Sequence, residues 1–231
     1  MKKAIAILTL ITLLIACSGC DLLSIFAQDT LEPQHILQQR AEYNNVSTRI
    51  EQFFNSININ AKNGDVALCE YTPPNEAAEY ILYKHKEAHA RYGGEYSLLF
   101  LFYPASLAHM LAGFAYQSQP FETFNEAQEL WDITRAELEK ECENAQTYTL
   151  WQIDAANNLS LQPLDALPNI GTISSQLVTA DTEYGYVEEF RRKVNPNDSD
   201  YYLVYLQFIY KPQLNAYCVN IIFADTPLYL P

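Results

Sequence analysis

Residues 183–224 decide the fold, because they read as strands and turns in alternation: EYGYVEEFRRKV (183–194), NPND (195–198), YYLVYLQFIYK (201–211), PQLN (212–215) and AYCVNIIFA (216–224). The three long segments are rich in Tyr and in β-branched residues, which favour strands, and the short segments between them suit tight turns. Three shorter stretches, 147–153, 158–162 and 173–179, have the same character. The second half of the chain is therefore predicted to form an antiparallel meander of four to five strands.

The first half is predicted to be helical. Apolar residues recur at spacings near three and four between His35 and Ile59, as in an amphipathic helix. A second helix is expected over 76–92, since a Pro-containing start precedes it and Gly93-Gly94 follows it. A capping box from Thr123 to Glu126 predicts another helix that ends near Asn144. One face of this last helix is apolar and is expected to be buried: Ala127, Leu130, Trp131, Thr134, Leu138 and Cys142.

Residues 96–121 contain no Lys, Arg, Asp or Glu, a length that would permit a transmembrane helix. Pro104 interrupts the stretch, however, and the basic flanks typical of a membrane span are missing. A buried core helix is the preferred interpretation, and a groove for an apolar ligand or partner is the remaining alternative. The expected fold class is thus α+β, with about four N-terminal helices packed on the C-terminal meander. Residues 34–231 would form one domain, with a helical half (34–145) and a sheet half (146–231).

The N-terminus carries an export signal. Lys2 and Lys3 precede thirteen uncharged, largely apolar residues (4–16), and Leu14-Ile15-Ala16-Cys17 follows the pattern of a lipobox. This segment resembles that of bacterial lipoprotein precursors, and the resemblance covers residues 1–20 only. It implies a signal peptide at 1–16, lipidation of Cys17 and a tether at 17–33 that holds the chain at the cell envelope, facing the periplasm.

Cys20 is the alternative lipidation site. By the same resemblance, Ser18 after a lipidated Cys17 favours the outer membrane, whereas Asp21 after a lipidated Cys20 favours the inner membrane. Several acyl chains together anchor a protein stably, which a single chain does not.

The chain has 28 acidic and 14 basic residues among 231, and its net charge is −14. Removal of residues 1–16 takes away two lysines and no acid, which makes the exported part still more acidic. Binding to a nucleic-acid backbone needs clustered cations, so this class of function is excluded. No nucleophile elbow, phosphate-binding loop or activated cysteine is recognisable, and no cofactor is expected.

Two sets of residues are candidate sites. His85 and His89 would lie one turn apart on the second predicted helix, a spacing that can chelate a metal ion. Lys86 takes the place of the glutamate that a zinc protease needs, and Glu95 and His109 are the only third ligands to suggest. An envelope metal-binding protein or hydrolase centred on this helix face is one alternative function.

The second set lies on the predicted sheet, where tyrosines alternate with acids. Tyr offers a large rigid contact area with a polar tip, and acids attract a basic partner. The preferred function is therefore that of a lipid-anchored protein that neutralises or docks a basic periplasmic protein through Tyr186, Glu188, Tyr201 and Tyr205. A further alternative is a structural or assembly lipoprotein that uses the apolar seam of residues 36–57.

Three cysteines of the predicted domain, Cys69, Cys142 and Cys218, remain besides those near the N-terminus. They would be exposed to an oxidising compartment, where disulfides among them are possible. Cys142 continues an apolar helical stripe and Cys218 lies in a predicted strand, so buried free thiols are the alternative.

Overall fold

The structure is a computed structural model, and it describes residues 36, 52–53, 66–71, 80–102, 111–156, 158–166, 169–171, 182–193, 199 and 201–224. The chain divides into two units, Met1–His35 and Ile36–Pro231, and every described residue belongs to the second. The elements are β1 (Val66–Tyr71), β2 (Tyr80–Arg91), β3 (Gly94–Phe102), β4 (Leu111–Ser118), α4 (Phe124–Glu141), β5 (Glu143–Ile153), β6 (Leu159–Leu164), β7 (Glu183–Lys193), β8 (Tyr201–Lys211) and β9 (Ala216–Ala224).

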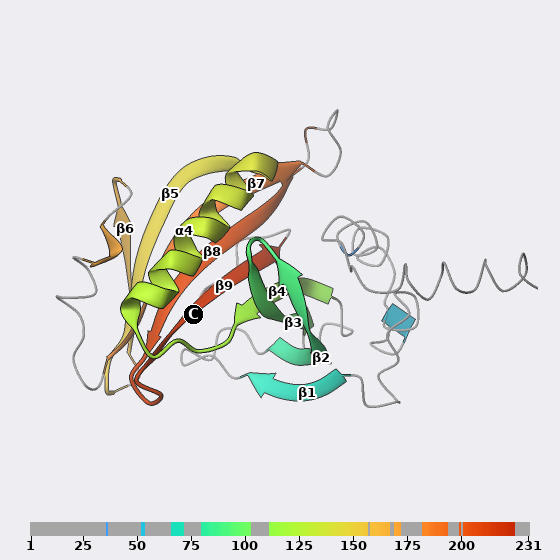
Figure 1. The fold of residues 1–231 in the computed structure, drawn as a ribbon, viewed down its shortest axis with the longest axis horizontal. Helices are drawn as coiled ribbons and strands as arrows, with labels where there is room; N and C mark the ends of the chain where they lie inside the picture. Colours follow the sequence, from blue (N-terminus) through green and yellow to red (C-terminus); the bar gives the residue numbers. More distant parts are fainter. Residues whose placement is uncertain are drawn as a thin grey trace, which may run out of the picture. The chain divides into compact units, whose positions relative to one another are not determined.

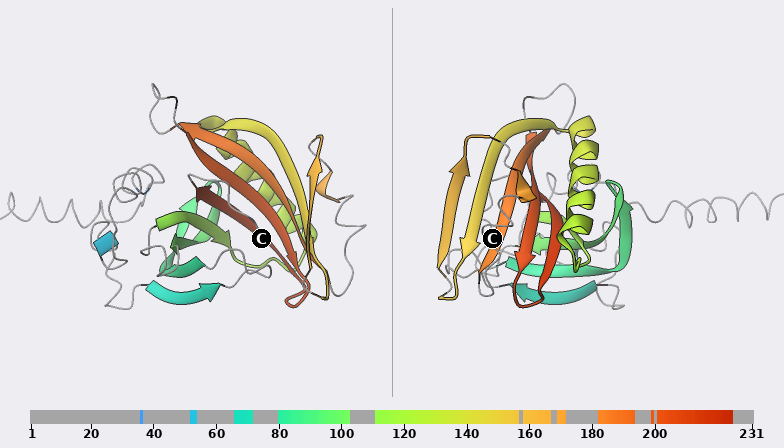
Figure 2. Two further views of the ribbon diagram at one scale, coloured as in Figure 1. Left: turned by 180° about the vertical axis from the view of Figure 1, so that it is seen from behind. Right: turned by 60° about the vertical axis from the view of Figure 1, so that its left-hand side comes forward.

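The predicted α+β arrangement, with about four N-terminal helices on a small meander, is wrong. The described residues form a nine-stranded antiparallel sheet in the order β1-β2-β3-β4-β9-β8-β7-β5-β6, and α4 is the one long helix among them. Figure 1 shows α4 in front of the strands of the second half and running roughly along them, and the right-hand view in Figure 2 shows it standing along one face of the sheet. The helical half predicted for 34–145 therefore contains four strands of this sheet.

The strands predicted in the second half are confirmed where the structure describes them. β7 and β8 pair as an antiparallel hairpin from Tyr184 opposite Tyr210 to Lys193 opposite Tyr201, and β9 pairs with the other side of β8. Asn215, with a φ of 46°, completes the turn into β9, a conformation that Asn tolerates well. The strand predicted at 173–179 lies outside the described residues.

The last strand joins the two halves of the sheet. β9 pairs with β4 as well as with β8, and Phe114 of β4 lies opposite Phe223 of β9. Their rings stack with centroids 4.6 Å apart, and neither side chain is exposed. The last described strand is thus the central one in the order of the sheet.

The helix predicted from the capping box is confirmed. Thr123 accepts a hydrogen bond from the backbone N–H of Glu126 and donates one to its carboxylate at 2.6 Å. The predicted apolar face is buried from Ala127 to Leu138 and packs toward β8 and β9. Trp131, at the centre of this face, meets Tyr186 and Phe208 edge to face with ring centroids 5.4 and 6.1 Å apart.

The helices predicted over 76–92 and 96–121 are wrong: the described residues of these ranges contain no helix, and nearly all of them lie in strands β2, β3 and β4. Gly93, which was expected to end a helix, forms the turn of the β2–β3 hairpin together with Tyr92, and their φ values are 76° and 46°. Two consecutive residues with positive φ are the mark of a tight hairpin turn that favours glycine. No helix among the described residues is long and apolar enough to cross a membrane.

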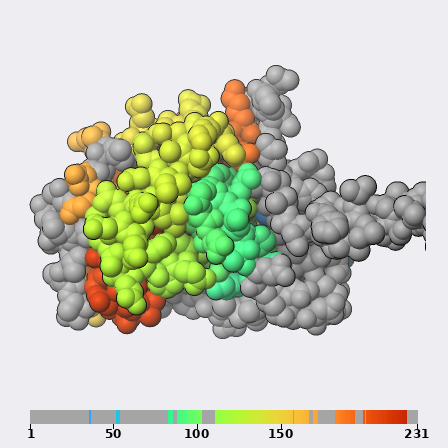
Figure 3. All heavy atoms as spheres, in the orientation of Figure 1, coloured from blue at the N-terminus to red at the C-terminus, as the bar shows by residue number. Residues whose placement is uncertain are grey.

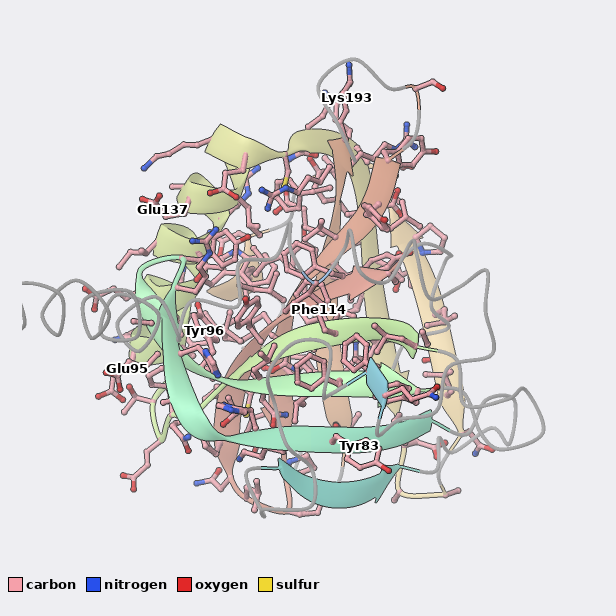
Figure 4. All side chains as sticks on the ribbon, turned by 90° about the vertical axis from the view of Figure 1, so that its right-hand side faces the viewer. Tyr83, Glu95, Tyr96, Phe114, Glu137 and Lys193 are labelled. Atoms are coloured by element: carbon pink, nitrogen blue, oxygen red, sulfur yellow. The ribbon has the colours of Figure 1, made fainter. Side chains whose placement is uncertain are left out.

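The tip of the β2–β3 hairpin packs against α4. A Cβ atom added to Gly93 would lie 2.2 Å from Cγ2 of Ile133, so only glycine lets the turn come this close to the helix. Figure 4 shows the hairpin bending so that its tip, with Glu95 and Tyr96, reaches the side of the helix. Tyr96 and Thr134 share a buried hydrogen bond of 2.6 Å, which joins the hairpin to α4.

The predicted helix over 35–59 is described at three residues only, Ile36, Gln52 and Phe53, and all three are helical. Phe53 is fully buried and contacts Phe100 and Phe102 of β3 edge to face, with centroids 5.5 Å apart in both pairs. At this position the apolar seam of residues 36–57 therefore packs on the sheet of its own domain.

Candidate functional site

Two ion pairs fasten α4 to β7. Arg135 donates two hydrogen bonds to the carboxylate of Glu188, from Nε at 2.8 Å and from Nη2 at 2.9 Å. Arg192, four residues further along the same face of β7, lies 2.9 Å from the carboxylate of Glu141. The helix thus contributes a cation to one pair and a carboxylate to the other, so that its register on the strand is fixed by charge.

Glu188 is a structural carboxylate. Its side chain is fully buried, and Asn144 donates a third hydrogen bond to it at 2.6 Å. The hydrogen bond to Glu188 raises the pKa of Arg135, which remains a cation. Tyr186, two residues away, is also fully buried, and burial together with the charge of Glu188 raises the pKa of its phenol.

This arrangement leaves the outer side of α4 acidic. Residues 122–143 contain eight acids and only two cations, Arg135 and Lys140. Arg135 binds buried Glu188 and also lies 2.9 Å from exposed Glu139 of the same helix, and Lys140 binds Glu137 at 2.6 Å. Glu129 and Asp132 are exposed and have no ion-pair partner among the described residues. Of the eight acids, Glu137, Glu139 and Glu141 thus have ion-pair partners, and the other five have none among the described residues.

The acidic side of the helix continues onto the β2–β3 turn. A shallow depression of about 650 Å³ lies between the two elements, and its lining includes Glu95, Glu137, Glu141 and Arg91. Figure 3 shows α4 and the β2–β3 hairpin as neighbours on one exposed face, and Figure 4 shows Glu95 and Glu137 on the same side of the molecule.

A large apolar side chain lies within this charged region. Ile133 is 42% exposed, although it also contacts the hairpin turn at Gly93. An exposed apolar residue ringed by charges has the composition of a small protein-binding surface, apolar at its centre and polar at its rim. We call the set Glu95, Glu129, Asp132, Ile133 and Glu137 the acidic surface.

Of the partner-binding residues predicted from the sequence, three have buried side chains. Tyr186 and Tyr205 lie on opposite faces of the sheet, the first beneath Trp131 of α4 and the second in a separate apolar cluster with Trp151 and Val187. Only Tyr201 is exposed, at 46%, with the guanidinium of Arg191 over its ring. The structure therefore does not gather Tyr186, Glu188, Tyr201 and Tyr205 into one surface.

His85 and His89 lie on strand β2 and not on a helix, which corrects the predicted helix face. Even so, Nδ1 of His85 and Nε2 of His89 are 2.9 Å apart. The described residues contain no group of three or more His, Cys, Asp or Glu side chains that could hold a metal ion. The structure thus joins the two predicted ligands, and a third is missing among the described residues; His109, suggested as one, lies outside them.

The cysteines are described in part. Cys142 and Cys218 are free thiols, and burial raises the pKa of both, that of Cys142 to about 11. Cys69 lies in β1, but its side chain is outside the described residues, as are Cys17 and Cys20.

The acidic surface is what reasoning from the sequence missed. The sequence did indicate it: eight acids lie within 122–143, on a helix whose boundaries and apolar face were predicted. The partner surface was predicted among the tyrosines of the sheet. Because successive side chains of a strand point to opposite faces, about half of such residues lie on the face that packs in the core. In comparisons with known proteins, no family model, no curated protein and no solved structure matches this chain.

Proposed function

We propose that this chain is a lipid-anchored protein of the bacterial cell envelope that binds a basic protein partner through the acidic surface. The observation that carries the proposal is the pairing of Arg135. This cation is shared between buried Glu188 and Glu139, so that Glu129 and Asp132, next to exposed Ile133, have no ion-pair partner among the described residues. The partner is of the class that the sequence indicates, a basic protein, but its binding surface lies on the helix and not on the sheet.

The charge of the chain supports a cationic partner. Residues 122–143 contribute eight of the 28 acids, so negative charge is concentrated along one helix. Such a field accelerates encounter with a basic protein and repels acidic ones, and both effects weaken as salt is added. The apolar side chain of Ile133 would supply the contact that salt does not weaken.

The lipobox supports the location. A lipid at Cys17, followed by the tether of residues 17–33, would hold the domain at the membrane while leaving α4 accessible to proteins of the periplasm. In this role the protein neutralises or docks its partner and carries out no reaction.

Site-specific photo-crosslinking in the native host tests the proposal. A photoreactive residue replaces Ile133 in the full chain, and the matched control carries it at Leu161 on β6, which is 51% exposed. The expected result is a crosslink to one basic protein from position 133 and none to that protein from 161. The crosslink should be lost in the charge-neutral variant Glu129→Gln/Asp132→Asn/Glu137→Gln.

The purified pair then gives the decisive measurement. The Kd should rise at least tenfold in the neutralised variant at low salt, and the difference should shrink as salt is added. An acidic partner, or a basic partner whose Kd is unchanged by the three substitutions, would refute the proposal.

A further inference from the structure

The contact between His85 and His89 is unusual for residues on a strand. Residues four apart on a regular strand point to the same face, but their Cα atoms are about 13 Å apart. Here the two rings have centroids 4.9 Å apart, and Nδ1 of one faces Nε2 of the other at 2.9 Å. Something in β2 must shorten the strand between them.

A β-bulge does this. Lys84 pairs with Leu99 and Ala88 with Ser97, so three residues of β2 (85–87) lie opposite the single residue Leu98 of β3. The two extra residues bend the strand; His85 is the first residue of the bulge, and His89 lies two residues beyond its end. Bulges of this kind re-aim side chains, and they occur often beside functional sites.

The pair is also well fixed. His85 is only 9% exposed and pairs with Val66 of β1, and His89 pairs with Tyr96 of β3, so each residue is held by one neighbouring strand. Two imidazole nitrogens are therefore held by a sheet rather than by a loop, which suits a site that must keep its geometry.

We propose that His85 and His89 bind one divalent transition-metal ion, through Nδ1 of His85 and Nε2 of His89. Two nitrogen ligands at the usual bond length of about 2.05 Å are about 2.9 Å apart when they subtend a right angle at the metal. This is the observed separation, and it matches neighbouring ligands of a tetragonal Cu²⁺ or Ni²⁺ ion. The ion would replace the hydrogen bond between the rings.

Within the part of the chain that the structure describes, the site has two protein ligands. Glu95, which the sequence offered as a third, lies at the hairpin turn opposite Ala90 and belongs to no ligand cluster among the described residues. The other coordination positions are taken by water or by a donor from a bound molecule. A metal-binding function is independent of the acidic surface, which is formed by α4 and the tip of the hairpin.

Titration of the full chain in detergent with Ni²⁺ tests this inference. Ni²⁺ is preferred to Cu²⁺ as the probe, because Cu²⁺ would oxidise thiols and the chain has five cysteines. Calorimetry should show one ion bound per chain, and X-ray absorption should show two imidazole ligands at about 2.05 Å.

His85→Gln and His89→Gln should each weaken binding by about tenfold or more, since glutamine keeps a polar side chain but is a poor ligand for Ni²⁺. The matched controls are His35→Gln and His109→Gln, which remove the only other histidines and should leave binding unchanged. Thermal unfolding checks that each variant is folded. If a variant does not fold, the X-ray absorption spectrum of wild-type protein with Ni²⁺ still shows whether two imidazoles bind the ion. The inference is wrong if the wild type binds no Ni²⁺ saturably, or if binding survives both glutamine substitutions.

Discussion

Arg135 of α4 and Glu188 of β7 are joined by two parallel hydrogen bonds, of 2.8 and 2.9 Å, although 53 residues separate them in the sequence. The side chain of Glu188 is fully buried and that of Arg135 is 23% exposed, so the pair lies at the edge of the interface between helix and sheet. It orients α4, and it leaves Arg135 to pair with only one further carboxylate of the helix, that of Glu139, at 2.9 Å. A single contact thereby links the stability of the domain to the charge of the surface that we propose for binding.

Replacement of Arg135 by methionine should be strongly destabilising. Glu188 would be left as a buried carboxylate without its cation, and loss of one partner of a buried pair costs about 3–5 kcal/mol. The matched control is Lys140→Met, which breaks an exposed pair with Glu137 on the same helix and should cost about 0–1 kcal/mol. Urea unfolding measures both changes, and equal losses of stability in the two variants would contradict the structural role of Glu188.

The turn of the β2–β3 hairpin gives a second prediction. Gly93→Ala should destabilise the domain by about 1–3 kcal/mol, because φ is 76° at this residue and the added Cβ would collide with Ile133. Adding Ile133→Ala should recover the part of this loss that comes from the collision. A double-mutant cycle by urea unfolding separates the two parts, and strictly additive effects would mean that the turn does not contact the helix.

The sequence predicted the second half of the fold well, because local signals agree there with the tertiary structure. The capping box at Thr123 placed α4, and Tyr and β-branched residues between clear turns placed β7, β8 and β9. These elements need no information from distant residues, apart from the order in which the strands pair.

The first half failed for two physical reasons. β4 is buried on both faces, and a continuous apolar run of this kind cannot be told from a buried helix by its periodicity. In β2 the bulge adds two residues and breaks the alternation, which left His85 and His89 at a spacing that also fits a helix. Gly93-Gly94 can end a helix and can equally form the turn of a hairpin, so these glycines did not distinguish a helix from a strand at 76–92.

Lipidation at the N-terminus remains a prediction from the sequence. Cys17→Ser should abolish incorporation of labelled palmitate and leave the precursor unprocessed, whereas Cys20→Ser should be labelled like the wild type. Mass spectrometry of the mature N-terminus identifies the modified residue. If Cys20→Ser alone loses the label, the lipidation site is Cys20, and retention in the inner membrane replaces sorting to the outer membrane as the expectation.

Alkaline pH should weaken the domain through Cys142. Burial, together with the charge of Glu141 and against that of Arg192, raises the pKa of this thiol from 9.0 to about 11. Above pH 9 the unfolded chain releases the proton while the folded chain keeps it, so the folded state binds more protons and its free energy of unfolding falls as pH rises toward 11. This contribution to stability is complete below pH 9 and is lost on passing through the native pKa. The control is Cys142→Ala, which has no thiol to titrate at this position. Between pH 9 and 11 the free energy of unfolding of the wild type should therefore fall more than that of the variant. A pH-independent difference would show that the thiol titrates alike in both states.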